Sequence, residues 1–186
     1  MTEHWRFLDT GSHDAFTNMA MDRAILEAHR TGLVPPTVRV YGWTPSAISI
    51  GYFQGMTEEV DVQACQQHGV DCVRRITGGG AVFHDKELTY SIVVAESHPK
   101  IPRNILESYG RICGALVRGL GGLSIASSFA PINDIVVGSQ KISGNAQTRK
   151  QGIVLQHGTI LLDVDVETMF TLLKVPSEKI KDIHPI

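Results

Sequence analysis

The residues best suited to chemistry lie between Arg74 and Asp85, in the run Arg-Arg-Ile-Thr-Gly-Gly-Gly-Ala-Val-Phe-His-Asp. Two guanidinium groups, whose forked donors suit phosphate or carboxylate, precede three consecutive glycines. A glycine costs about 1 kcal/mol relative to alanine inside a helix or strand, so the triplet predicts a loop that can approach a ligand closely. The run lacks both the Lys-Ser or Lys-Thr of a P-loop and the G-x-G-x-x-G of dinucleotide sites. It indicates an anion-binding loop of another kind, with a tight structural turn as the alternative.

A second segment with chemical potential covers residues 131–147. Two short apolar stretches flank a Gly-Ser pair there, which is the pattern of a β-hairpin. Lys141 begins the returning strand and is followed by the small residues Ser143 and Gly144, so that a ligand can lie directly beside the lysine. The alternative is an ordinary solvated hairpin lysine.

The elements that must position these residues follow from the periodicity of apolar side chains along the chain. The expected helices are 14–30, 61–69, 104–120 and 165–174. The expected strands are 38–41, 47–51, 70–75, 88–95, 135–137, 141–142 and 154–162. The glycine run then connects two strands, and the pattern indicates one mixed α/β or α+β domain.

Composition excludes several classes of function. A chain of 186 residues with a net charge of −2 is one domain by size and has no basic field for nucleic acid. It contains no apolar run of membrane-spanning length and no apolar core typical of a signal peptide. The three cysteines form no C-x-x-C pair, and no two of the eight histidines show metal-ligand spacing. We expect a cytoplasmic protein that binds neither nucleic acid nor membrane.

Together, the glycine run and the lysine segment resemble the lipoate–protein ligase family, within the biotin/lipoate ligase and octanoyltransferase superfamily. The resemblance is carried by residues 75–85, 133–135 and 141–147, with support from 49–54 and 156–158. It implies an α+β catalytic domain over residues 1–186, with a largely antiparallel sheet flanked by helices, as in biotin protein ligases and class II synthetases. Family members usually continue with further helices and often with an accessory domain, which this chain is expected to lack. The chain is then either a truncated form or a natural short subunit that works with a separate C-terminal accessory subunit.

As a function, the resemblance implies an ATP-dependent lipoate–protein ligase. In that reaction the lipoate carboxylate attacks the α-phosphate of ATP, and a lysine of an acceptor domain then takes the lipoyl group from lipoyl-AMP. The implied cofactors are ATP and Mg²⁺, and lipoate is the substrate. The implied acceptors are lipoyl domains of 2-oxoacid dehydrogenases or the glycine cleavage H protein.

The same resemblance implies roles for individual residues. Lys141 is the catalytic residue, contacting the acyl carboxylate and the α-phosphate. Asp134 is expected to hold Mg²⁺, or instead a ribose or adenine donor. The residues expected to bind the nucleotide or acyl-adenylate are Arg75, Gly78, Gly79, Gly80, Ala81, Val82, Phe83, Asn133 and Asp134. The substrate pocket is expected to include Tyr52, His84, Gly144 and His157, with Trp43, Ile48 and Phe53 as further apolar candidates.

The main alternative is an octanoyltransferase of the same superfamily, which moves an acyl chain from acyl carrier protein or another lipoyl domain without ATP. These enzymes use a cysteine thioester. Their subgroups place the cysteine in stretches that correspond to residues 127–131 or 173–177, and neither stretch contains cysteine here. This absence and the intact glycine triplet favour the ligase. A biotin ligase and a non-catalytic subunit that holds lipoate or an acyl-adenylate are the remaining alternatives.

Overall fold

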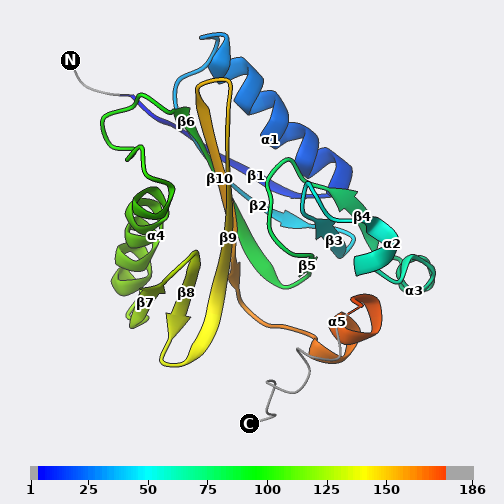
Figure 1. Cartoon of the computed structure of the whole chain (residues 1–186). Helices are drawn as coiled ribbons and strands as arrows, with labels where there is room; N and C mark the ends of the chain where they lie inside the picture. The colour runs from blue at the N-terminus through cyan, green and yellow to red at the C-terminus, as the bar shows by residue number, and fades with distance from the viewer. Residues whose placement is uncertain (1–3, 175–186) are drawn as a thin grey trace.

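The computed structural model describes residues 4–174 (Figure 1). Within this range the largest element is a seven-stranded sheet of order β1-β2-β6-β10-β9-β8-β7. Neighbouring strands run antiparallel except for β1 and β2, which are parallel. The prediction of a largely antiparallel sheet with flanking helices is therefore confirmed. The strands are β1 (Arg6–His13), β2 (Thr37–Trp43), β6 (Glu87–Ala95), β7 (Ser127–Ala130), β8 (Asp134–Val137), β9 (Gln140–Lys150) and β10 (Ile153–Leu161).

A smaller sheet carries the glycine run. Its order is β4 (Asp71–Arg74), β3 (Ala47–Ile50) and β5 (Val82–His84), so that the glycines connect its two outer strands. Three short helices lie at the same end of the molecule in Figure 1, namely α2 (Met56–Glu59), α3 (Val62–His68) and α5 (Val166–Leu172). The apolar cluster between these elements is formed by Ile48, Ile50, Val60, Cys65, Phe83 and Leu172.

Two longer helices cover the faces of the large sheet. Helix α1 (Ala15–Arg30) begins at the cap Asp14, and α4 (Ile105–Gly122) begins at the cap Asn104. Leu155 of β10 packs in one cluster with Leu26 of α1, whereas its neighbour Val154 packs with Ile112 of α4. Because successive side chains of a strand point to opposite faces, the odd-numbered residues of β10 face α1. His157 and Thr159 therefore lie on that face.

The structure departs from the predicted elements where pairing, rather than periodicity, forms a strand. Strands β1, β5 and β7 were not expected, because they are short or mixed in polarity and are formed by pairing with a neighbouring strand. Helix α2 was not expected because it has only four residues. The short strand predicted at 141–142 is the start of the long β9. Within residues 4–174, no helix has both the length and the apolar character needed to cross a membrane. Residues 175–177 of one cysteine-free stretch lie outside the described range.

Candidate active site

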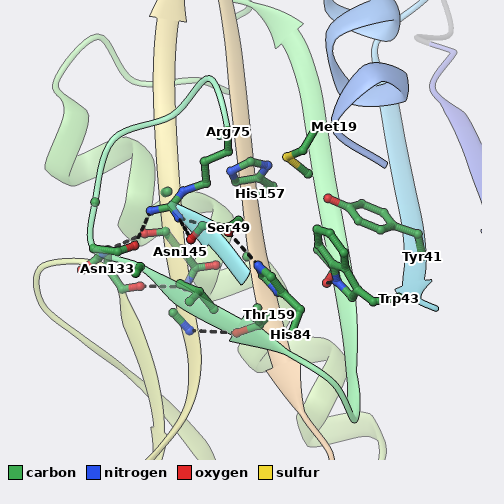
Figure 2. A pocket seen from close by; sticks show the side chains of 18 of the residues that line it. Met19, Tyr41, Trp43, Ser49, Arg75, His84, Asn133, Asn145, His157 and Thr159 are labelled. Atoms are coloured by element: carbon green, nitrogen blue, oxygen red, sulfur yellow. Dashed lines mark hydrogen bonds between the residues drawn. The ribbon is translucent and has the colours of Figure 1, made fainter. Parts of the chain in front are cut away.

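A cavity of ≈ 210 Å³ lies between the two sheets, beneath the glycine loop (residues 75–81). The large sheet contributes residues from β2, β6, β9 and β10, while the small sheet and the loop form the opposite wall. Figure 2 shows Met19, Tyr41 and Trp43 on one side of this cavity and Asn133 and Asn145 on the other. The cavity thus has an apolar end and a polar end.

Arg75 holds the glycine loop through hydrogen bonds to the loop backbone, and its guanidinium is not free to bind a ligand with both nitrogens. Its guanidinium donates to the carbonyls of Ser49, Gly78 and Gly80 at 2.7–2.9 Å and to the Ser49 hydroxyl at 3.1 Å. Burial lowers the pKa of Arg75 to about 10, so the side chain still carries its charge at neutral pH. Arg74 likewise donates to backbone carbonyls of residues 51–54. The two guanidiniums, expected to bind an anion directly, hold the backbone that surrounds the cavity.

The glycines permit an unusually close approach of two backbone segments. A Cβ atom on Gly51 would lie 2.0 Å from the carbonyl oxygen of Gly79, and Gly79 itself has a φ of +97°. Within residues 4–174 the N–H groups of Gly79 and Gly80 donate to no acceptor, and both residues line the cavity. These N–H groups are therefore available to negative charge on a bound molecule.

Lys141 lies at the edge of the cavity with its ammonium 2.9 Å from a carboxylate oxygen of Asp134. More than half of the Lys141 side chain is exposed. A Cβ on Gly144 would lie 3.3 Å from the ammonium nitrogen, so glycine at this position leaves room for the lysine. Asp134 acts as the counterion of Lys141, and among the described residues no group of three or more His, Cys, Asp or Glu residues could hold a metal.

Asn133 reaches the cavity edge because a reciprocal contact fixes it to β9. Its side-chain amide donates to the carbonyl of Asn145, and the Asn145 amide donates to the carbonyl of Asn133 at 2.7 Å. The hydroxyl of Tyr90 donates to the Asn145 side-chain oxygen at 2.5 Å. This contact positions the loop that precedes β8 beside Lys141.

His157 connects the glycine loop to a buried ion pair. The Thr77 hydroxyl lies 2.7 Å from Nε2 of His157, and Nδ1 lies 3.1 Å from the Asp22 carboxylate. A carboxylate accepts hydrogen bonds only, so Nδ1 of His157 is the donor to Asp22. Asp22 also binds Arg39 at 2.9 Å, and both residues are buried. Sequence reasoning missed Asp22, although Asn18 and Asp22 are polar residues on the inner face of a predicted helix.

His84 occupies the middle of the cavity wall between two polar partners. Its Nε2 lies 2.7 Å from the Ser49 hydroxyl, and its Nδ1 lies 2.8 Å from a carboxylate oxygen of Glu87. The imidazole stacks on Trp43, with ring centroids 4.1 Å apart. Ser49 and Glu87 were not among the expected site residues, although Ser49 opens the stretch 49–54 that supports the family resemblance.

Several expected residues do not line the cavity. Phe83 lies in the apolar cluster of the small sheet, because alternation along β5 turns Val82 and His84 toward the cavity and the intervening side chain away. Ile48 is likewise fully buried in that cluster. Tyr52 and Phe53 follow the end of β3 and are 51% and 90% exposed. Of the glycine triplet, Gly79 and Gly80 line the cavity, whereas Gly78 does not.

Comparison with known proteins adds information that geometry alone does not contain. A family model described as the lipoyl protein ligase A/B catalytic domain matches residues 14–186. The octanoyltransferase LipM of Kyrpidia tusciae is 45% identical, covering 96% of this chain and 73% of that protein. The octanoyltransferase LipM of Geobacillus kaustophilus is 43% identical, covering 97% and 73%. A solved bi-partite lipoate protein ligase from Thermoplasma acidophilum is 29% identical with a TM-score of 0.79, covering 97% of this chain and 70% of that chain.

These relatives overturn one expectation. Proteins 40–45% identical over most of the chain are octanoyltransferases, so the expectation of an ATP-dependent lipoate ligase is wrong. The physical reason is that a glycine loop and a lysine stabilise negative charge on an acyl carbonyl as well as on a phosphate. The motifs that suggested adenylation therefore do not distinguish the two reactions. ATP and Mg²⁺ were expected only because the ligase reaction needs them, so the octanoyltransferase relatives give no support for either.

Proposed function

This chain belongs to the lipoyl protein ligase A/B catalytic domain family, and from that premise we propose that it is an ATP-independent acyltransferase. It takes an octanoyl group from a carrier thioester and transfers it to a lysine of an acceptor lipoyl domain. The donor is acyl carrier protein, or alternatively another lipoyl domain. The acceptors are lipoyl domains of 2-oxoacid dehydrogenases or the glycine cleavage H protein. The similarity to octanoyltransferases over nearly the whole chain supports this assignment.

The observation that carries the proposal is the shape and polarity of the cavity. Its volume of ≈ 210 Å³ lies below the roughly 300–1,000 Å³ typical of sites for drug-sized ligands, and it suits a slender acyl chain. The acyl chain occupies the apolar end of the cavity, which is lined by Met19, Tyr41 and Trp43. The acyl carbonyl then lies at the polar end, near Lys141 and Asn133.

The residues around the acyl carbonyl fit acyl transfer. When a nucleophile attacks a thioester, negative charge develops on the carbonyl oxygen, and donors already in place lower the barrier. The Lys141 ammonium and the N–H groups of Gly79 and Gly80 are such donors at one end of the cavity. Asp134 keeps the ammonium oriented through their 2.9 Å contact. The thiolate of the carrier leaves, and the acceptor amine gains the acyl group as an amide.

A transfer assay tests the proposal. Octanoyl acyl carrier protein and an unmodified lipoyl domain are mixed with the protein without ATP and with a metal chelator, and the acceptor is weighed by mass spectrometry. We expect the acceptor to gain one octanoyl group. Because removal of one oxyanion donor costs about 10²–10³ in rate, Lys141→Met should slow transfer about 100-fold.

Lys86→Met is the matched control. Lys86 also forms an exposed ion pair at 2.9 Å, with Asp163, but it does not line the cavity. We expect this variant to transfer at the wild-type rate. Acceptor modification that requires ATP and free octanoate, with none from the carrier thioester, would refute the proposed function.

A further inference from the structure

The cavity contains no cysteine side chain, although acyl transfer from a thioester commonly passes through a covalent intermediate. The chain has three cysteines, all within the described residues. Cys65 and Cys113 are buried, and burial raises their pKa to about 12 and about 11. Cys72 is half-buried in β4 and does not line the cavity either. Because no thiol lines the cavity, its hydroxyl groups are the candidates for a covalent carrier.

Among the hydroxyls that line the cavity, Ser49 has the geometry of an activated nucleophile. Its Oγ lies 2.7 Å from Nε2 of His84, and Nδ1 of the same ring lies 2.8 Å from Oε1 of Glu87. This is the order hydroxyl, imidazole, carboxylate that recurs in acyl-transfer enzymes on unrelated folds. Such a group is recognised by geometry and roles, since the order of its members in the chain varies between folds. Figure 2 shows Ser49 and His84 joined at the cavity wall.

The surrounding donors hold Glu87 beside His84. Oε1 of Glu87 also receives hydrogen bonds from Trp43 Nε1 and from the Thr89 hydroxyl. In the role of a general base, His84 carries its proton on Nδ1, toward Glu87, and its Nε2 accepts from Ser49. The stacking of Trp43 on the imidazole fixes the plane of the ring.

Arg75 places a positive charge beside the Ser49 hydroxyl. Its guanidinium donates a hydrogen bond to Ser49 Oγ at 3.1 Å. The Ser49 hydroxyl donates to His84 and accepts from Arg75, and its second lone pair has no hydrogen bond among the described residues. A cation at this distance stabilises negative charge that develops on the oxygen as its proton moves to His84. Gly79 and Gly80 line the same cavity, and their N–H groups, which donate to no acceptor among residues 4–174, can bind the carbonyl oxygen of the acyl group.

We propose that Ser49 is the nucleophile that carries the acyl group as an oxygen ester, with His84 as its general base and Glu87 as the residue that orients His84. This inference rests on the proposed acyltransferase function. Ser49 Oγ attacks the thioester carbonyl, its proton passes to His84 Nε2, and the same proton leaves with the carrier thiol. The neutral amine of the acceptor lysine then attacks the ester, an amide forms, and Ser49 regains its proton through His84.

The test separates ester formation from the complete reaction. The protein is mixed with octanoyl acyl carrier protein without acceptor, quenched in acid, and its intact mass and modified peptide are measured. We expect one octanoyl adduct on the peptide that contains Ser49, stable to neutral hydroxylamine and cleaved by alkaline hydroxylamine. Ser49→Ala should lose the adduct and slow transfer at least 100-fold. Ser49→Cys should recover an adduct that neutral hydroxylamine cleaves.

Ser46→Ala is the matched control, because Ser46 precedes the same strand and donates to Asp85 at 2.8 Å outside the cavity. It should retain both the adduct and transfer. Thermal unfolding of each variant verifies that it is folded. Transfer by the wild type without an adduct, or an adduct that persists in Ser49→Ala, would overturn the role of Ser49 while leaving the proposed function intact. Absence of both adduct and transfer would overturn the two together.

Discussion

Replacing Asp22 by asparagine should destabilise the protein strongly, because the carboxylate balances a buried guanidinium. Asp22 accepts hydrogen bonds from Arg39, Tyr41, Ser91 and His157 at 2.8–3.1 Å. The side chains of the Asp22–Arg39 pair are 2% and 0% exposed. Breaking a buried pair by removing one partner costs about 3–5 kcal/mol, since the other charge stays buried without compensation. For a protein of this size, that loss lowers the melting temperature by roughly 6–20 °C.

Urea unfolding of Asp22→Asn beside Asp163→Asn measures this effect. Asp163 pairs with Lys86 at the same 2.9 Å separation, but both side chains are more than half exposed. Solvent screens such a pair, so the control should unfold almost at the wild-type urea concentration. If the Asp22 variant lost no more stability than the Asp163 variant, the buried cluster would not contribute as the structure indicates.

The pH dependence of the same variant follows from the direction of one pKa. Burial alone would raise the pKa of Asp22, but the hydrogen bond and charge of His157 and the charge of Arg39 outweigh burial and hold it below its ordinary 3.8. A lowered pKa contributes stability that is fully present above pH 3.8 and is lost as the pH falls through the folded-state pKa. The advantage of the wild type over Asp22→Asn should therefore persist at neutral pH and diminish below pH 3.8. A difference that stayed constant through this range would contradict the pKa direction.

Two further predictions concern the loop and the cysteines. Gly79→Ala should lower both stability and the rate of octanoyl transfer, because Gly79 has a φ of +97° and a Cβ there would lie 2.9 Å from the Arg75 guanidinium. The left-handed conformation costs alanine about 1–2 kcal/mol. A Cβ at Gly78 meets open space, so Gly78→Ala should behave like the wild type. Equal melting temperatures for the two variants would contradict this explanation. Treatment with iodoacetamide should leave transfer unchanged, since no cysteine lines the cavity. Inactivation that follows alkylation of Cys72 would show that a thiol takes part.

Local sequence was sufficient for the elements that carry their own signal. The expected helix at 61–69 has its cap at Asp61 and ends at Gly69, which adopts the left-handed conformation that glycine favours. The long helices and the central strands were expected for the same reason, because their apolar periodicity extends over several turns or residues. The sequence also indicated the glycine loop and Lys141 as candidate site residues, and the fold places both at one cavity.

Tertiary structure alone decided how the polar side chains around the cavity meet. Strands β3 and β5 pair antiparallel in a register that sets Ser49 opposite Val82. His84 lies two residues beyond Val82 on the same face of β5, so its imidazole reaches the Ser49 hydroxyl diagonally. Thr77, His157 and Asp22 come from a loop, a strand and a helix. Buried polar groups require hydrogen-bond partners, and strand register and helix packing decide which partners are near. No local pattern encodes that choice, so the residue types were readable from the sequence while their pairing was not.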